Sequence, residues 1–256
     1  MPRILAVANQ KGGVGKTTTS INLAASLSRA GKRVLLVDLD PQGNATMGSG
    51  VDKRASAATV YEVLLGACDI RSARVRCDKV GFDLVPANQE LAGAEVELVA
   101  MERRENRLKV ALAEIEAGYD YILVDCPPAL NLLTVNALTA AHAVMIPMQC
   151  EYYALEGLSD LVQTIRKVRA HLNPRLEIEG LLRTMYDARN TLSQQVSDQL
   201  QKHFGAKVYR TIIPRNVRLA EAPSHGMPAI DFDKTSKGAL AYLSLADEIL
   251  QQPSTT

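Results

Sequence analysis

The chain has no tryptophan, and only 4% of its 256 residues are aromatic. Proteins that bind single-stranded nucleic acid without sequence preference stack the bases on several aromatic side chains, so a site of this kind is not expected. The four cysteines, Cys68, Cys77, Cys126 and Cys150, lack CxxC spacing, and no basic and apolar leader precedes the first predicted strand. Neither a disulfide scaffold nor export is therefore predicted, and a cytoplasmic location is expected.

Long apolar segments and an excess of charge are also missing. No apolar run approaches the roughly 18 to 20 residues that cross a bilayer, so a soluble protein is expected. The formal net charge is only +1, and the field of the whole molecule will not hold the protein on nucleic acid or on an acidic membrane. Any such binding requires a local basic patch.

Hydrophobic residues make up 47% of the chain, which is enough for a large core. No repeat, linker or charge block marks a second domain, so a single domain over residues 1–251 and a flexible tail over residues 252–256 are predicted. Glycines and small polar residues without apolar periodicity make the segment 43–56 the best candidate for a mobile loop.

Short β-branched apolar runs alternate with stretches of helical spacing. This alternation predicts an α/β fold in which a buried, mostly parallel sheet carries helices on both faces. The last predicted helix has an apolar stripe, interpreted as core, at Leu240, Leu243, Leu245, Ile249 and Leu250. The predicted strands are 4–8, 34–37, 82–86, 121–124, 143–147, 178–182 and 208–213, and the predicted helices are 16–29, 59–65, 89–101, 104–117, 132–141, 155–171, 192–204 and 237–251.

A glycine-rich loop lies between the first predicted strand and the first predicted helix. Its residues are Lys11-Gly12-Gly13-Val14-Gly15-Lys16-Thr17-Thr18. Glycines permit backbone angles that side chains forbid, and the free amides at a helix start bind phosphate oxygens. The loop therefore predicts a nucleotide site in which Lys16 neutralises the β- and γ-phosphates and Thr17 binds Mg²⁺.

The loop departs from the strict P-loop pattern at one position. That pattern has glycine five residues before Gly15, where this chain has Gln10, and Lys11 stands directly before the glycine pair. A glycine-rich turn that only joins a strand to a helix is the alternative interpretation. Six specified positions in the correct strand-loop-helix context make a chance match improbable.

Carboxylates follow two later predicted strands. Asp38 and Asp40 end the second strand and Asp125 ends a later one, at the sheet edge where open α/β folds bind ligands. Asp40 and Asp125 are predicted to hold Mg²⁺ and to orient water. For Asp38, the choice between this role and that of a helix cap or turn former stays open.

Over nearly its whole length the chain resembles the deviant-Walker ATPases of the ParA/Soj and MinD group. Two segments, 149–157 and 213–224, are specific to the ParA/Soj branch. The motifs that carry the resemblance are residues 11–18, Asp38-Leu39-Asp40-Pro41-Gln42-Gly43-Asn44, Asp125-Cys126-Pro127-Pro128, Gln149-Cys150-Glu151-Tyr152-Tyr153-Ala154-Leu155-Glu156-Gly157, and Ile213-Pro214-Arg215-Asn216-Val217-Arg218-Leu219-Ala220-Glu221-Ala222-Pro223-Ser224.

The resemblance implies a P-loop NTPase three-layer fold and a role for each matching residue. Lys11 is similar to a signature lysine that reaches the phosphates of a partner subunit in an ATP-dependent homodimer. Lys16 resembles the P-loop lysine, Thr17 and Asp125 the magnesium ligands, and Asp40 the residue that positions attacking water and lies by the metal. Pro214, Arg215 and Asn216 match the segment that lies against adenine.

The resemblance also implies a nucleotide-driven cycle. ATP would join two subunits, slow hydrolysis to ADP and phosphate would separate them, and a ParB-like centromere-binding protein would accelerate that step. Members of this branch bind double-stranded DNA non-specifically, which implies a nucleoid-associated protein. Residues 202–237 contain seven Lys or Arg against three acidic residues, a local charge of +4. The residues that match or extend the DNA-binding positions are Arg189, Arg218, Lys234 and Lys237.

Four alternatives compete with this interpretation. A MinD-like membrane ATPase would need a basic amphipathic final helix, but Asp247 and Glu248 lie there and no Lys or Arg follows Lys237, so stable membrane association is not expected. An iron–sulfur reductase would need a second cysteine to pair with Cys126 at a dimer interface. A DNA-binding scaffold without hydrolysis is disfavoured by Asp40. The plasmid-type class, with an additional N-terminal region, is not expected because the first strand starts at Arg3.

Overall fold

The computed structural model describes residues 2–252, and residues 253–256 of the predicted tail lie outside the described part. Eight strands form one sheet in the order β3-β4-β2-β5-β1-β6-β7-β8. Every neighbouring pair is parallel except β3 and β4. The strands are β1 (Arg3–Val7), β2 (Val34–Asp38), β3 (Val75–Cys77), β4 (Phe82–Val85), β5 (Tyr121–Asp125), β6 (Ala143–Gln149), β7 (Glu177–Tyr186) and β8 (Val208–Pro214).

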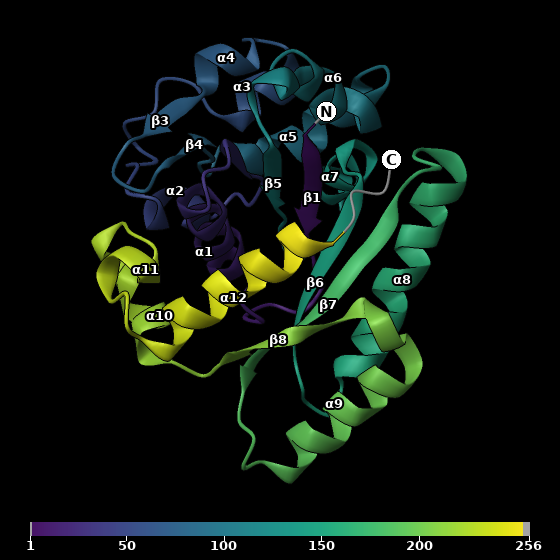
Figure 1. The fold of residues 1–256 in the computed structure, drawn as a ribbon. Helices are drawn as coiled ribbons and strands as arrows, with labels where there is room; N and C mark the ends of the chain where they lie inside the picture. Colours follow the sequence, from purple (N-terminus) through teal and green to yellow (C-terminus); the bar gives the residue numbers. More distant parts are fainter. Residues whose placement is uncertain (1, 253–256) are drawn as a thin grey trace.

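Helices cover both faces of this sheet, as Figure 1 shows. One face carries α3 to α9, and the other carries α1, α2 and α10 to α12. The helices are α1 (Lys16–Arg29), α2 (Asn44–Gly48), α3 (Val60–Leu65), α4 (Ile70–Ala73), α5 (Leu91–Glu97), α6 (Arg107–Ala113), α7 (Leu132–Ala140), α8 (Ala154–His171), α9 (Thr191–Phe204), α10 (Val217–Glu221), α11 (Ala229–Phe232) and α12 (Lys237–Gln251). The predicted mostly parallel sheet with flanking helices is confirmed.

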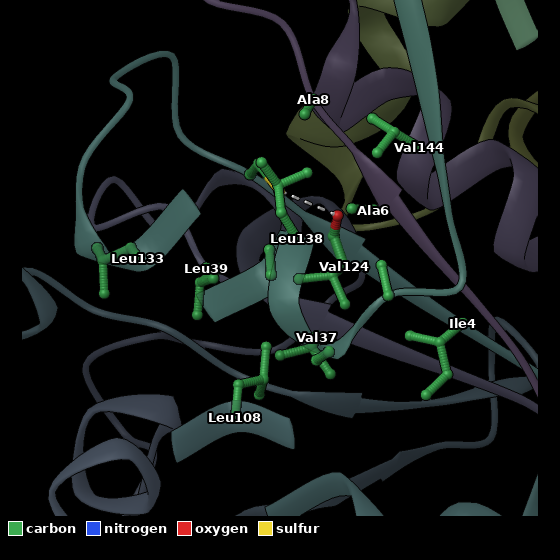
Figure 2. Close-up of a cluster of buried hydrophobic side chains, with 14 of the residues drawn as sticks. Ile4, Ala6, Ala8, Val37, Leu39, Leu108, Val124, Leu133, Leu138 and Val144 are labelled. Carbon is green, nitrogen blue, oxygen red and sulfur yellow. Dashed lines mark hydrogen bonds between the residues drawn. The ribbon is translucent and has the colours of Figure 1, made fainter. Parts of the chain in front are cut away.

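Alternate residues of the central strand β1 belong to two separate cores. Ile4 and Ala6 pack on the α3-to-α9 side, and Leu5 packs on the α1 and α12 side. Figure 2 shows the first core, to which Val124 of β5 and Val144 of β6, the two strands beside β1, contribute together with Leu133 and Leu138 of α7. Successive side chains of a strand point to opposite faces of the sheet. Because both faces of β1 are buried, its sequence is a continuous apolar run.

The predicted and observed elements differ in several places. The short helices α4, α10 and α11 were not predicted. The strand β3 was not predicted, because it has only three residues and one of them is the exposed Arg76. The segment 43–56 was predicted to be a mobile loop, but it contains the helix α2, whose Ala45 and Thr46 are fully buried. The stripe assigned to the core of the last helix is wrong at Leu240, which is 50% exposed, because Tyr242 and Ala246 occupy the inner face of α12.

Candidate functional site

The glycine-rich loop runs from the end of β1 into the first turn of α1. Gly13 has a φ of +72° and Gly15 a φ of +89°, and Gly15 is the N-cap of α1. No side chain caps this helix start. A Cβ added at Gly12 or Gly13 would meet no atom within 4 Å. The loop therefore has an open outer side from which a phosphate group can reach the backbone amides.

Lys16 lies beneath this loop and is almost completely buried. Its ammonium group donates to the backbone carbonyl of Lys11 over 3.1 Å. Burial lowers the pKa of Lys16, and the negative charges of Asp125 and Asp40 partly oppose that effect. A buried cation of this kind is stabilised by an anion close to it.

Asp125 ends β5, directly beside β1, and is fully buried. Its carboxylate accepts a hydrogen bond of 2.8 Å from the Thr17 hydroxyl and one of 2.8 Å from the Ser20 hydroxyl. Burial and, next, the charge of Asp38 raise the pKa of Asp125 to about 7. The sequence did not indicate Ser20, because a serine one turn into a helix has no distinguishing pattern. The structure thus brings Thr17 and Asp125 together, as predicted.

Asp38 and Asp40 follow the neighbouring strand β2 but have different surroundings. Asp38 is buried and accepts from the amide and the hydroxyl of Thr46, over 2.8 and 2.7 Å. Burial raises the pKa of Asp38 to about 6. Asp40 is partly exposed and accepts from the Gln42 amide over 2.9 Å. Asp38 therefore anchors α2 to the sheet, which favours the interpretation as a structural residue.

The donor set at these strand ends fits a magnesium ion bound with a nucleotide. Mg²⁺ is usually held by one or two carboxylates together with water and phosphate oxygens. Thr17 and Asp125 supply a hydroxyl and a carboxylate in contact, and Asp40 is near enough for its charge to raise the pKa of Asp125. Within residues 2–252, no group of three His, Cys, Asp or Glu side chains could hold a metal. The residues present thus suit a shared site better than an all-protein cage.

Lys11 lies on the exposed side of the loop. Its amide donates to the Asn9 side chain over 3.0 Å, and its ammonium group forms an ion pair with Glu151, just after β6. Its side chain is 42% exposed. Glu151 belongs to a motif quoted from the sequence, but pairing with Lys11 could not be read from it, because the two residues are 140 positions apart.

The predicted adenine segment lies at the end of the edge strand β8. Pro214 is paired with Tyr186 of β7, and the Arg215 amide donates to the Tyr186 carbonyl over 3.4 Å. The side chain of Asn216 caps α10 by accepting from the Arg218 amide. These three residues lie at the same sheet edge as the glycine-rich loop, because β8 is parallel to β7 and β1 is parallel to β6.

Two of the four predicted DNA-binding residues are already paired with carboxylates. Arg189, in the loop between β7 and α9, forms an ion pair of 2.9 Å with Asp187, although 91% of its side chain is exposed. Arg218 pairs with Glu221 and Asp233. Arg218 and Lys234 line one hollow of about 530 Å³, and Lys237 begins α12 shortly after it.

Thr184 of β7 is a further residue of the site that the sequence did not indicate. It is buried, and its hydroxyl donates to the carbonyl of Val14 over 2.7 Å. Thr184 and Val14 are 170 positions apart. A threonine inside an apolar strand is common in α/β proteins, so no signal in the sequence marked it.

Several large apolar side chains are exposed in segments that follow the strands at the loop end of the sheet. Tyr152 and Tyr153 are 74% and 69% exposed and pack edge to face. Others in such segments are Met47, Leu130, Leu192 and Val217.

Cys126 is buried and its thiol contacts the Val124 carbonyl, drawn as a dashed line in Figure 2. Burial raises the pKa of this thiol far above its usual range. An iron–sulfur cluster shared between subunits needs thiolates at a surface, and Cys126 does not offer one. In the part of the chain that the structure describes, no helix is long and apolar enough to cross a membrane.

Comparison with known proteins gives consistent results. A family model described as an AAA domain matches residues 2–178. The chain is 56% identical to the sporulation initiation inhibitor protein Soj of Bacillus subtilis, over 97% of this chain and 98% of that protein. It is 53% identical to the chromosome partitioning protein ParA of Caulobacter vibrioides, over 98% and 94% of the two chains.

Among solved structures, the fold is similar to that of cobyrinic acid a,c-diamide synthase from Mycobacterium smegmatis with bound ADP and magnesium. The TM-score is 0.86 and the identity is 44%, over 98% of this chain and 95% of that one.

Proposed function

Because this chain belongs to the ParA/Soj family of chromosome-partitioning ATPases, we propose that it acts as a switch that ATP closes and hydrolysis opens. In the closed state two copies form a dimer that binds double-stranded DNA without sequence preference. In the open state the copies separate and leave the DNA. A ParB-like protein sets the rate of this cycle by stimulating hydrolysis, and the ATPase is a nucleoid-associated protein of the cytoplasm.

The arrangement of Lys16, Thr17 and Asp125 carries the proposal. A buried ammonium group and a hydroxyl bonded to a buried carboxylate lie at the start of one helix, under a loop with free amides. The Lys16 charge and the amides would bind the β- and γ-phosphates of ATP, and Thr17 and Asp125 would hold Mg²⁺. When bound, the metal ion would neutralise part of the negative charge of the phosphates.

The closed state follows from where Lys11 lies. Its side chain is on the exposed side of the loop and is paired with Glu151, whereas Lys16 is beneath the loop. A lysine in that position is free to exchange an exposed carboxylate for the phosphate of a second copy, because exposed ion pairs contribute only about 0 to 1 kcal/mol. The exposed Tyr152, Tyr153 and Val217 would be buried in the same contact.

Hydrolysis in this scheme depends on Asp40. This carboxylate is partly exposed at the same sheet edge, and among residues 2–252 it accepts only the Gln42 amide of a local turn, so one oxygen remains for water. Phosphoryl transfer requires placement of water and compensation of charge more than covalent assistance. A site completed only in the dimer is expected to turn over slowly until a partner improves its geometry.

DNA is favoured over a membrane surface as the second ligand by the position of α12. This helix buries Tyr242, Leu245 and Ile249 against the sheet and α1. A helix that lies on a membrane needs its apolar face free. The cations near the end of the chain remain at the surface, where Lys234 and Lys237 are exposed.

A measurement of mass in solution tests the switch. With Mg²⁺ and a non-hydrolysable ATP analogue, light scattering on the wild-type protein should give twice the monomer mass. Lys11→Ala should bind the analogue and remain a monomer, because it lacks the charge that crosses the interface. Lys16→Ala should neither bind nor dimerise. A wild-type protein that stays monomeric when saturated with the analogue, or a Lys11→Ala dimer of unchanged affinity, would contradict the proposal.

A further inference from the structure

Thr184 is the point at which β7 contacts the glycine-rich loop. Its side chain is only 2% exposed, and its hydroxyl donates to the Val14 carbonyl over 2.7 Å. Its Cβ and methyl group lie 3.8 Å from the position that a Cβ on Gly15 would take. Strand β6 separates β7 from β1, so this contact reaches across a neighbouring strand to hold the loop.

The hydrogen bond fixes the plane of one peptide group. The carbonyl of Val14 and the N–H of Gly15 belong to the same peptide bond, which is trans like every peptide bond in residues 2–252. In a trans peptide the C=O and the N–H point in opposite directions. Because Thr184 holds the carbonyl toward β7, the Gly15 N–H points away from β7. Gly15 has a φ of +89° and no Cβ, so it restricts the rotation of this peptide plane less than another residue would.

We propose that Thr184 is a positioning residue of the nucleotide site, which orients the Gly15 N–H toward the phosphates by holding the Val14 carbonyl. The inference rests on the proposed function, because it assumes that the loop binds ATP. Thr184 itself does not touch the nucleotide in this scheme. Without the Thr184 hydroxyl, the peptide plane between Val14 and Gly15 can rotate. The Gly15 N–H then has to be ordered when the nucleotide binds, which lowers the affinity.

The backbone directly after Thr184 supports a functional role for this strand end. Met185 has a φ of +48°, in the left-handed region that residues other than glycine, asparagine and aspartate rarely adopt. Such a conformation costs on the order of 1 to 3 kcal/mol and persists where the surroundings enforce it. The Gln149 side chain donates to the Met185 sulfur over 3.0 Å. The pairing of β7 with β8 is irregular between Arg183 and Tyr186, which is where β7 places Thr184 against the loop.

Three substitutions test the role of the hydroxyl. Thr184→Val has nearly the same shape but no donor, and Thr184→Ser keeps the donor. Thr139→Val is the matched control, because the Thr139 hydroxyl is also buried but has no hydrogen-bond partner among the described residues. Affinity for fluorescent ATP and ADP analogues is measured with Mg²⁺ at a temperature well below unfolding. Thr184→Val should bind both about tenfold more weakly, and Thr184→Ser and Thr139→Val should stay within about twofold of wild type.

The amide resonance of Gly15 separates positioning from a loss of stability. In the wild-type protein, addition of a non-hydrolysable ATP analogue should move this resonance strongly downfield, and in Thr184→Val at saturation the movement should be smaller. If Thr184→Val does not fold, Thr184→Cys, whose thiol is a weaker donor, replaces it and should change affinity in the same direction.

The outcomes distinguish this inference from the proposed function. A wild-type protein that does not bind ATP would overturn both. Normal binding by the wild type and equal affinity in Thr184→Val would overturn the role of Thr184 alone. Failure of Thr184→Ser to restore affinity, or an equal loss in Thr139→Val, would show that packing and not the hydroxyl matters, and would also overturn it.

Discussion

At the residue scale, the site contains two charged side chains, Lys16 and Asp125, whose charged forms are destabilised by burial. Burial lowers the pKa of Lys16 and raises the pKa of Asp125 to about 7. Each shift has the direction expected for a charge taken out of water. A nucleotide phosphate beside Lys16 and a divalent cation beside Asp125 would reverse both effects. Ligand binding should therefore stabilise the charged form of each residue.

Asp40 is the residue for which a catalytic role makes the sharpest prediction. Asp40→Ala should bind ATP and dimerise like the wild type, but its rate of phosphate release should fall at least about 100-fold, because a positioned base contributes on that order. Phosphate release with and without DNA and a ParB-like partner measures this effect.

The matched control is Asp52→Ala. Asp52 is exposed and accepts the amide of Arg54 over 2.9 Å, in the same local turn that Asp40 makes with Gln42. It follows α2 and lies outside the predicted site. Asp52→Ala should keep wild-type turnover. Wild-type activity in Asp40→Ala would remove Asp40 from the mechanism. A loss of activity in Asp52→Ala as large as that in Asp40→Ala would assign the effect to the local turn structure.

At the scale of elements, the short helix α2 depends on hydrogen bonds to the end of β2. The Thr46 hydroxyl donates to Asp38 over 2.7 Å and accepts from the Ala87 amide over 2.9 Å, and all three residues are buried. Five residues of helix are not stable in water without tertiary contacts. The Asp38 carboxylate therefore helps to place the segment 39–43, which contains Asp40.

Thr46→Val should lower the free energy of unfolding by about 2 to 4 kcal/mol, because it leaves a buried carboxylate and a buried amide short of one partner each. Urea titration in the absence of nucleotide measures the change. Ser49→Ala is a milder comparison at the C-cap of the same helix, because the Ser49 hydroxyl donates to the Ala45 carbonyl one turn earlier. A decrease below about 0.5 kcal/mol in Thr46→Val would mean that water or a local shift replaces both bonds.

At the scale of the whole molecule, the proposed DNA binding would have to come from a surface patch, because the net charge is only +1. The structure shows that Arg218 is paired with Glu221 and Asp233 and lies 6.0 Å from the centre of the Phe232 ring. A phosphate must therefore compete with two carboxylates for this arginine. Few such contacts exist in each copy, so binding should require the dimer and should weaken steeply with salt.

Arg218→Ala should weaken the affinity of the ATP-bound dimer for DNA. The loss of affinity should be the same for DNA molecules of unrelated sequence. The slope of log affinity against log salt should become shallower by about 1 for each DNA phosphate that the variant no longer neutralises. Arg76→Ala is the control, because Arg76 is also an exposed arginine paired with a carboxylate, Asp78, but lies on β3 and is not one of the predicted DNA-binding residues. DNA retention unchanged by Arg218→Ala, with dimerisation intact, would exclude Arg218 from the DNA-binding surface.

Much of the architecture was predictable from the chain alone. The apolar runs predicted seven of the strands, and the helical spacing after the glycine-rich loop predicted α1 over Lys16–Arg29, the bounds that the structure shows. Local periodicity determines these elements because each buries its apolar residues against the sheet. It failed where tertiary contacts outweigh local preference. α2 forms in a glycine-containing segment because Asp38 holds it, and Leu240 stays exposed because other residues of α12 face the core.

The glycine spacing and the alternation of strands and helices were enough to place the glycine-rich loop and the acidic strand ends at one sheet edge, because neighbouring parallel strands end at the same edge. Only the tertiary structure decided which side chains meet across the sheet. Thr184 holds Val14, Ser20 holds Asp125 and Glu151 pairs with Lys11. The partners in these pairs are 170, 105 and 140 positions apart and share no local pattern. The order of the strands sets these contacts, and that order exists only in the folded chain.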